Sequence, residues 1–141
     1  MLVEDYYKLI NEVVEIDTEV SSIADSRRLL VEINEKESIL LKLKENIVKD
    51  IRTAESAYIK EKAAIRDKYS MDQNTGITKI IKGSPKNKRI KELKRLEAKS
   101  GKNINGLKEL KHIIEDLIIQ FNDIKVPVSK SMRDRFANSS F

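Results

Sequence analysis

The chain has 141 residues, of which 36% are charged and 40% hydrophobic, but only 5% are aromatic and none is tryptophan. This balance is typical of long helices rather than of a globular core rich in aromatic rings. Four glycines and two prolines leave few positions for turns, so we predict one all-α domain with few, long helices. The absence of cysteine excludes disulfides, thiolate metal sites and thiol nucleophiles.

The first 26 residues are strongly acidic, with seven acids and one base, a net charge of −6. Tyr6, Leu9 and Val13 recur at helical spacing, so a helix or the lead-in to one is expected here. The segment lacks the basic and apolar stretches of a secretory leader. No apolar run in the chain approaches the ~18 residues of a membrane span. We therefore expect a cytoplasmic protein without a transmembrane segment.

Residues 12–70 are predicted to form one very long helix. Apolar side chains recur there with a mean spacing near the ~3.5 residues of a coiled coil. No Pro or Gly interrupts residues 13–69. The residues of this apolar stripe that we expect at an oligomer interface are Ile16, Val20, Ile23, Leu30, Ile33, Leu40, Ile47, Ile51 and Tyr58.

Two features disturb the regular pattern of the long helix. Charged residues fall at four positions where a strict heptad has an apolar residue: Arg27, Glu37, Lys44 and Lys62. The apolar stripe drifts by one position in response, which favours bundle-like packing over a zipper seam. Short polar residues at 17–18 and 21–22 compete with the backbone for hydrogen bonds. A break at one of these places is therefore the alternative to an unbroken helix.

A loop over residues 71–84 is predicted from the turn formers Asn74 and Gly76. Ser84 followed by Pro85 is typical of a helix start. We expect that second helix to cover about 85–99.

The second helix is predicted to end in a loop or kink before a third one. Two glycines within 100–106 would each cost about 1 kcal/mol inside a helix, so we favour an interruption over a continued helix. A strongly amphipathic pattern then predicts a helix over about 106–123. Val126 followed by Pro127 should keep it from continuing, because the residue before a proline avoids helical geometry. The basic tail, 128–141, is expected to be one short helix or disordered.

The predicted fold is therefore an elongated helical hairpin or coiled-coil bundle, confined to a single domain over residues 1–127. The very long helix packs antiparallel against the shorter return helices. These return helices are too short to cover it, so much of its apolar stripe stays exposed. An exposed stripe of that length is typical of an interface, and we expect a homo-oligomer, a dimer or larger.

The strongest functional signal is a basic segment, 79–102, which has ten bases and two acids. Such a cluster is typical of phosphate-backbone binding, and the lack of aromatic residues in it argues against base stacking. The alternative is a solvated face that meets the acidic segment 1–26 or another acidic partner. The basic residues are Lys79, Lys82, Lys86, Lys88, Arg89, Lys91, Lys94, Arg95, Lys99 and Lys102.

Few residues are suited to catalysis. His112 is the only histidine, and nothing near it suggests a nucleophilic triad. Glu109 and His112 have the Glu-x-x-His spacing of di-iron bundles, but that pattern needs two copies and the chain has one. No phosphate-binding glycine loop, zinc-finger spacing or small-molecule site is evident. We expect no catalytic residue, no metal and no cofactor.

We therefore predict a non-enzymatic helical interaction or scaffold protein that self-associates through the apolar stripe at 13–69. The alternative function is sequence-nonspecific nucleic-acid binding through residues 79–102. The charge pattern alone does not separate these two functions.

Overall fold

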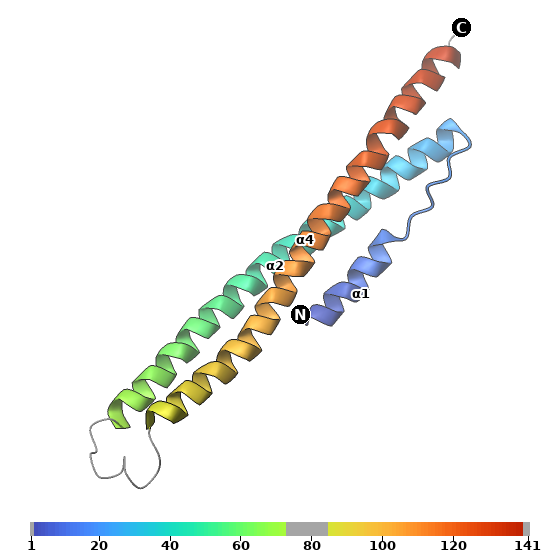
Figure 1. The fold of residues 1–141 in the computed structure, drawn as a ribbon. Coiled ribbons are helices and arrows are strands. Elements are labelled where there is room, and N and C mark those ends of the chain that lie inside the picture. The colour runs from blue at the N-terminus through green and yellow to red at the C-terminus, as the bar shows by residue number, and fades with distance from the viewer. Residues whose placement is uncertain (1, 73–84, 140–141) are drawn as a thin grey trace. The chain divides into compact units, whose positions relative to one another are not determined.

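The computed structural model describes residues 2–72 and 85–139. These residues form three helices and no strand: α1 (Val3–Val14), α2 (Ile23–Asp72) and α4 (Pro85–Ser139). Figure 1 shows α2 and α4 as the two long helices and α1 as the short one. The all-α prediction is confirmed. None of the described helices has a stretch that is both long and apolar enough to cross a membrane.

The prediction of one unbroken helix over 12–70 is wrong, because α1 ends at Val14 and α2 begins at Ile23. The break lies where the short polar residues occur. The Ser22 hydroxyl accepts a hydrogen bond of 3.1 Å from the Asp25 backbone N–H. The Asp25 carboxylate in turn accepts hydrogen bonds from the Ser21 hydroxyl at 2.5 Å and from the Ser21 backbone N–H at 3.3 Å. The Ser22 contact satisfies a donor that a helix start leaves unpaired, and the Asp25 contacts hold Ser21 against the first turn.

The return segment is one helix of 55 residues, so the separate helices predicted over 85–99 and 106–123 are wrong. Gly101 and Gly106 lie inside α4, and so does Pro127. Phe121 is buried and Val128 half-buried on either side of the proline. Packing of these side chains offsets the hydrogen bond that a proline removes. The tail 128–141 is helical through residue 139.

The loop predicted over 71–84 falls mostly on residues 73–84, which lie outside the described residues. The described chain divides into two compact units. Unit 1 comprises Met1–Val48 and Glu109–Phe141, and unit 2 comprises Lys49–Lys108. Each long helix contributes residues to both units.

Unit 1 is built from three helical segments. Glu37 lies 2.9 Å from Lys125, and Lys44 lies 3.4 Å from Glu115. From the first pair to the second, the α2 residue number rises from 37 to 44 while the α4 residue number falls from 125 to 115. The two helices are therefore antiparallel here. The α1 helix buries Tyr6 and two aliphatic residues in the same unit. The buried apolar side chains of unit 1 are Tyr6, Ile10, Val13, Leu29, Ile33, Leu40, Leu43, Ile47, Leu110, Ile114 and Phe121.

Unit 2 is a two-helix hairpin. Lys108 lies 3.5 Å from Glu55, and Lys68 lies 3.3 Å from Glu92, which again gives antiparallel helices. Two helices can bury only the stripe along which they touch. The buried apolar side chains among the described residues of unit 2 are accordingly few: Tyr69, Leu96 and Leu107.

Candidate binding surface

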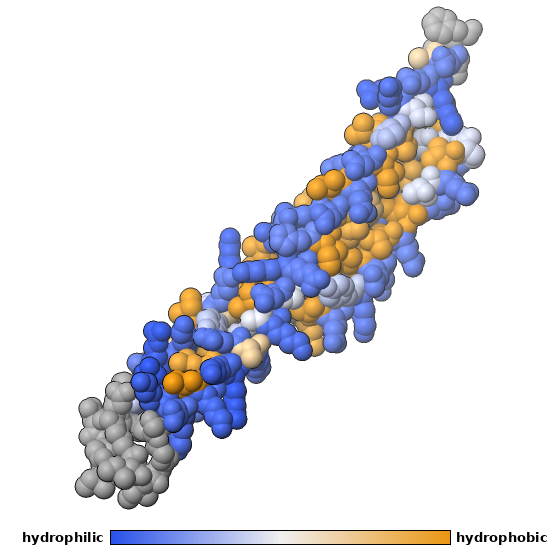
Figure 2. Space-filling view, in the orientation of Figure 1, coloured by the Kyte–Doolittle hydropathy of each residue, from blue (hydrophilic) through white to orange (hydrophobic). Residues whose placement is uncertain are grey.

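Unit 1 is acidic overall and unit 2 is basic overall. Unit 2 contains 17 Lys and Arg residues and 7 Asp and Glu residues, a net charge of +10. Unit 1 contains 11 basic and 16 acidic residues, a net charge of −5. On the face drawn in Figure 2, apolar side chains gather mainly over unit 1, whereas hydrophilic side chains cover most of unit 2. Unit 2 is therefore where an anionic partner would be attracted.

Half of the predicted basic cluster forms one line on α4. Successive members are separated by three, four, four and three residues, which keeps them on one side of a helix. All five side chains are exposed. At about 1.5 Å per residue the line is about 21 Å long. We call this line the basic stripe; it consists of Lys88, Lys91, Arg95, Lys99 and Lys102.

Two carboxylates of α4 lie within the sequence range of the basic stripe, but they differ in position. Glu97 is two residues from both Arg95 and Lys99 and so projects from a different side of the helix. Glu92 is four residues after Lys88 and three before Arg95, which places it beside the stripe. Of these two, only Glu92 is therefore placed to neutralise the stripe.

Glu92 contacts two residues of α2, the opposite helix of unit 2. The buried Tyr69 hydroxyl donates a 2.8 Å hydrogen bond to its Oε1 atom, and Lys68 Nζ lies 3.3 Å from the same atom. The Tyr69 hydrogen bond is the main cause that holds the pKa of Glu92 below its ordinary value, and Lys68 and Arg95 add to it. Within residues 2–72 and 85–139, no carboxylate lies within ion-pair distance of a stripe residue.

The other predicted basic residues are spread around the stripe. Lys79 and Lys82 lie outside the described residues. Lys86 and Lys94 are exposed. Arg89 is half-buried, and its Nε atom is buried without a hydrogen-bond partner among the described residues. The structure thus places seven of the ten predicted residues in solvent.

The predicted oligomer-interface residues do not share one environment. Ile33, Leu40 and Ile47 are fully buried inside unit 1. Their apolar surface is covered within a single chain. The remaining predicted residues are half-buried: Ile16, Val20, Ile23, Leu30, Ile51 and Tyr58.

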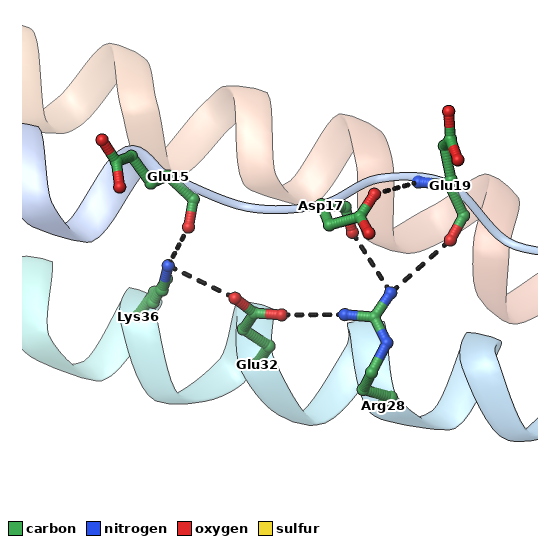
Figure 3. A network of polar contacts seen from close by, with 6 residues as sticks. All are labelled: Glu15, Asp17, Glu19, Arg28, Glu32 and Lys36. Carbon is green, nitrogen blue, oxygen red and sulfur yellow. Dashed lines mark hydrogen bonds and ion pairs between the residues drawn. The ribbon is translucent and has the colours of Figure 1, made fainter.

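A polar network holds the extended segment after α1 against α2 (Figure 3). Arg28 donates hydrogen bonds to the backbone carbonyls of Asp17, at 3.2 Å, and Glu19, at 3.5 Å. Its other terminal nitrogen lies 3.0 Å from Glu32. Glu32 also pairs with Lys36 at 3.3 Å, and Lys36 donates to the Glu15 carbonyl. Helical periodicity does not predict these backbone partners of Arg28, because they depend on the chain break between α1 and α2.

The Glu-x-x-His spacing on α4 does not lead to a metal centre among the described residues, which contain no group of three or more potential ligands. Glu109 and His112 are both exposed. His112 Nδ1 lies 3.7 Å from Glu115. Burial raises the pKa of Glu115, but Lys44 and Lys111 outweigh it, and the pKa is lowered overall.

The chain matches no family model, no curated protein and no solved structure.

Proposed function

We propose that this chain binds nucleic acid without sequence preference, through the basic stripe of unit 2. The observation that carries the proposal is the line of five exposed cations, beside which the one neighbouring carboxylate, Glu92, is already held by Tyr69 and Lys68. Cations that neutralise backbone phosphates release the condensed counterions, and this release supplies nonspecific affinity.

The residue types in the stripe favour phosphates over bases. Four of the five cations are lysines, which act as compact point charges without a fixed hydrogen-bonding fork. Arg95 is the only member with a planar guanidinium fork. Contacts between lysines and phosphates position a protein on the nucleic-acid backbone and carry no sequence information.

An acidic protein is a weaker candidate for the partner. Stable protein interfaces have an apolar centre surrounded by a polar rim. The basic stripe contains no apolar member, and the exposed residues Asn87, Ala98 and Asn105, which share its side of α4, are polar or small. A partner recognised by charge alone fits this surface better.

The test is fluorescence anisotropy with a labelled DNA of mixed sequence at low salt. Reversing Lys91→Glu and Lys99→Glu should weaken binding on the order of tenfold or more, because each change replaces an attraction by a repulsion. The matched control reverses Lys49→Glu and Lys60→Glu, two exposed lysines of α2 in the same unit.

The control changes net charge equally and should retain most of the affinity. Equal losses in both variants would show that the stripe is not the binding surface. Equal binding to polyglutamate of the same charge would point to an acidic protein instead.

We also propose self-association, with coiled-coil packing, as a second function. Large apolar side chains that remain exposed in unit 1 support it, among them Val31, Leu41 and Ile119. The length of α4 weighs against it, because a 55-residue return helix leaves less of α2 uncovered than short return helices would. Light scattering at micromolar concentration tests this function, and a monomer mass of 16.3 kDa would contradict it.

A further inference from the structure

We infer that the preferred ligand of the basic stripe is a double-stranded nucleic acid, contacted along its phosphate backbone, rather than a single strand. This inference rests on the proposed function and deepens it. Proteins that hold single strands combine a basic groove with aromatic side chains on which successive bases stack. Unit 2 supplies the charge but not the stacking surface.

Neither tyrosine of unit 2 is an exposed side chain. Tyr69 is buried, and its hydroxyl is committed to Glu92. Tyr58 is half-buried, and the Lys62 ammonium lies 5.7 Å from the centre of its ring. The sequence of unit 2 contains no other aromatic residue. A single strand would therefore gain phosphate contacts here and no stacking energy.

The stripe is also suited to the regular phosphate spacing of a duplex. Its cations are held in line by one continuous helix over a length of about 21 Å. A duplex presents one phosphate per ~1.7 Å of axis, so about twelve fall within that length. Even if only half of these face the protein, they are about as many as the five stripe cations. A flexible single strand would have to be straightened to offer the same array.

Duplex and single strand differ in the number of counterions released. For five phosphate contacts, the logarithm of affinity falls with the logarithm of salt with a slope of about −4.5 for a duplex and about −3.5 for a single strand. Between 50 and 200 mM salt these slopes correspond to losses of about 500-fold and about 130-fold.

The experiment compares a labelled 25-base-pair DNA duplex with one of its own strands, using the full chain in anisotropy titrations across that salt range. We expect tighter binding to the duplex at low salt and the steeper slope for the duplex. Equal or tighter binding to the single strand would overturn the inference while leaving the proposed function intact. Binding to neither probe would overturn both.

A second variant tests the reason for the preference. Ala98 is exposed and lies three residues after Arg95 and four before Lys102, so it sits beside the stripe. Ala98→Trp supplies the missing stacking surface, and it should raise single-strand affinity by about fivefold or more with a smaller effect on the duplex. The matched control is Ala98→Leu, which adds apolar area without a ring system suited to stacking. An Ala98→Trp variant that binds the single strand no better than the Ala98→Leu control would contradict the explanation.

Discussion

Tyr69 donates a hydrogen bond of 2.8 Å to the Glu92 carboxylate, across the two helices of unit 2. The bond comes from one of the few buried side chains of this unit. It joins the thin core of the hairpin to the edge of the basic stripe, since Glu92 is the carboxylate beside Lys88 and Arg95. The same contact thus supports the fold of unit 2 and holds the carboxylate beside the stripe toward the opposite helix.

Tyr69→Phe keeps the ring but removes the donor, so the pKa of Glu92 should rise toward its ordinary value of 4.5. A pKa lowered by folding contributes stability that is complete above the unfolded value and is lost as pH falls through the folded value. Unit 2 of the parent chain should therefore lose stability below about pH 4.5, and the variant should lose less. Carboxyl NMR titration measures the pKa, and urea unfolding at pH 7 and pH 3 measures the stability. A pKa unchanged in the variant would contradict the role of the hydrogen bond.

The core of unit 1 is tested by two isoleucines of α4 that are five residues apart. Ile114 is fully buried, whereas Ile119 is 57% exposed. Ile114→Ala should lower the free energy of unfolding by about 2–5 kcal/mol, because it removes buried methyl groups and leaves a cavity. Ile119→Ala should change it by less than about 0.5 kcal/mol. Urea unfolding followed by circular dichroism measures both, and equal costs would show that α4 is rotated from the described orientation.

The attachment of the extended segment is tested at Arg28. Arg28→Ala removes the donors to the Asp17 and Glu19 carbonyls. A net hydrogen-bond contribution of about 1 kcal/mol corresponds to about fivefold faster amide exchange in residues 15–19. The control is Arg27→Ala, because Arg27 is exposed and has no hydrogen bond or ion pair to the other described residues. Similar exchange in the two variants would mean that the network does not hold the segment.

The continuity of α4 is tested at Gly101. A Cβ atom built on this helical glycine meets nothing within 4 Å, so an alanine fits without displacement. Gly101→Ala should stabilise unit 2 by about 1 kcal/mol, since glycine costs about that much relative to alanine in a helix interior. The reverse change at the neighbouring exposed position, Ala98→Gly, should destabilise it by a similar amount. A destabilising Gly101→Ala would show that the chain is not helical at this position.

Helical periodicity predicted the class of fold and the antiparallel return, but not the helix boundaries. The break before α2 had a signal in the sequence, because Ser22 and Asp25 have the spacing of a capping box in front of an apolar run. The continuity of α4 had no such local signal. Its glycines and Pro127 all favour interruption, and packing against other helices overrides that preference.

The alignment of the basic stripe likewise could not be predicted from local sequence. Composition located the cluster of cations, but its alignment depends on α4 being helical through Lys102, which the predicted loop at 100–106 would have prevented. The contact between Tyr69 and Glu92 was also out of reach of sequence reasoning. It requires the register of two helices that are separated by residues 73–84, and periodicity does not determine that register.

The most direct measurement of the central claim is the salt dependence of duplex binding in the parent chain and in Lys91→Gln. If the five stripe cations contact phosphates, the slope of log affinity against log salt should be about −4.5 in the parent. Removing one contact should reduce its magnitude by about 0.9. Lys60→Gln on α2 should leave the slope unchanged. A parent slope near zero, or the same slope in the parent and in Lys91→Gln, would contradict the claim that the basic stripe binds the phosphate backbone.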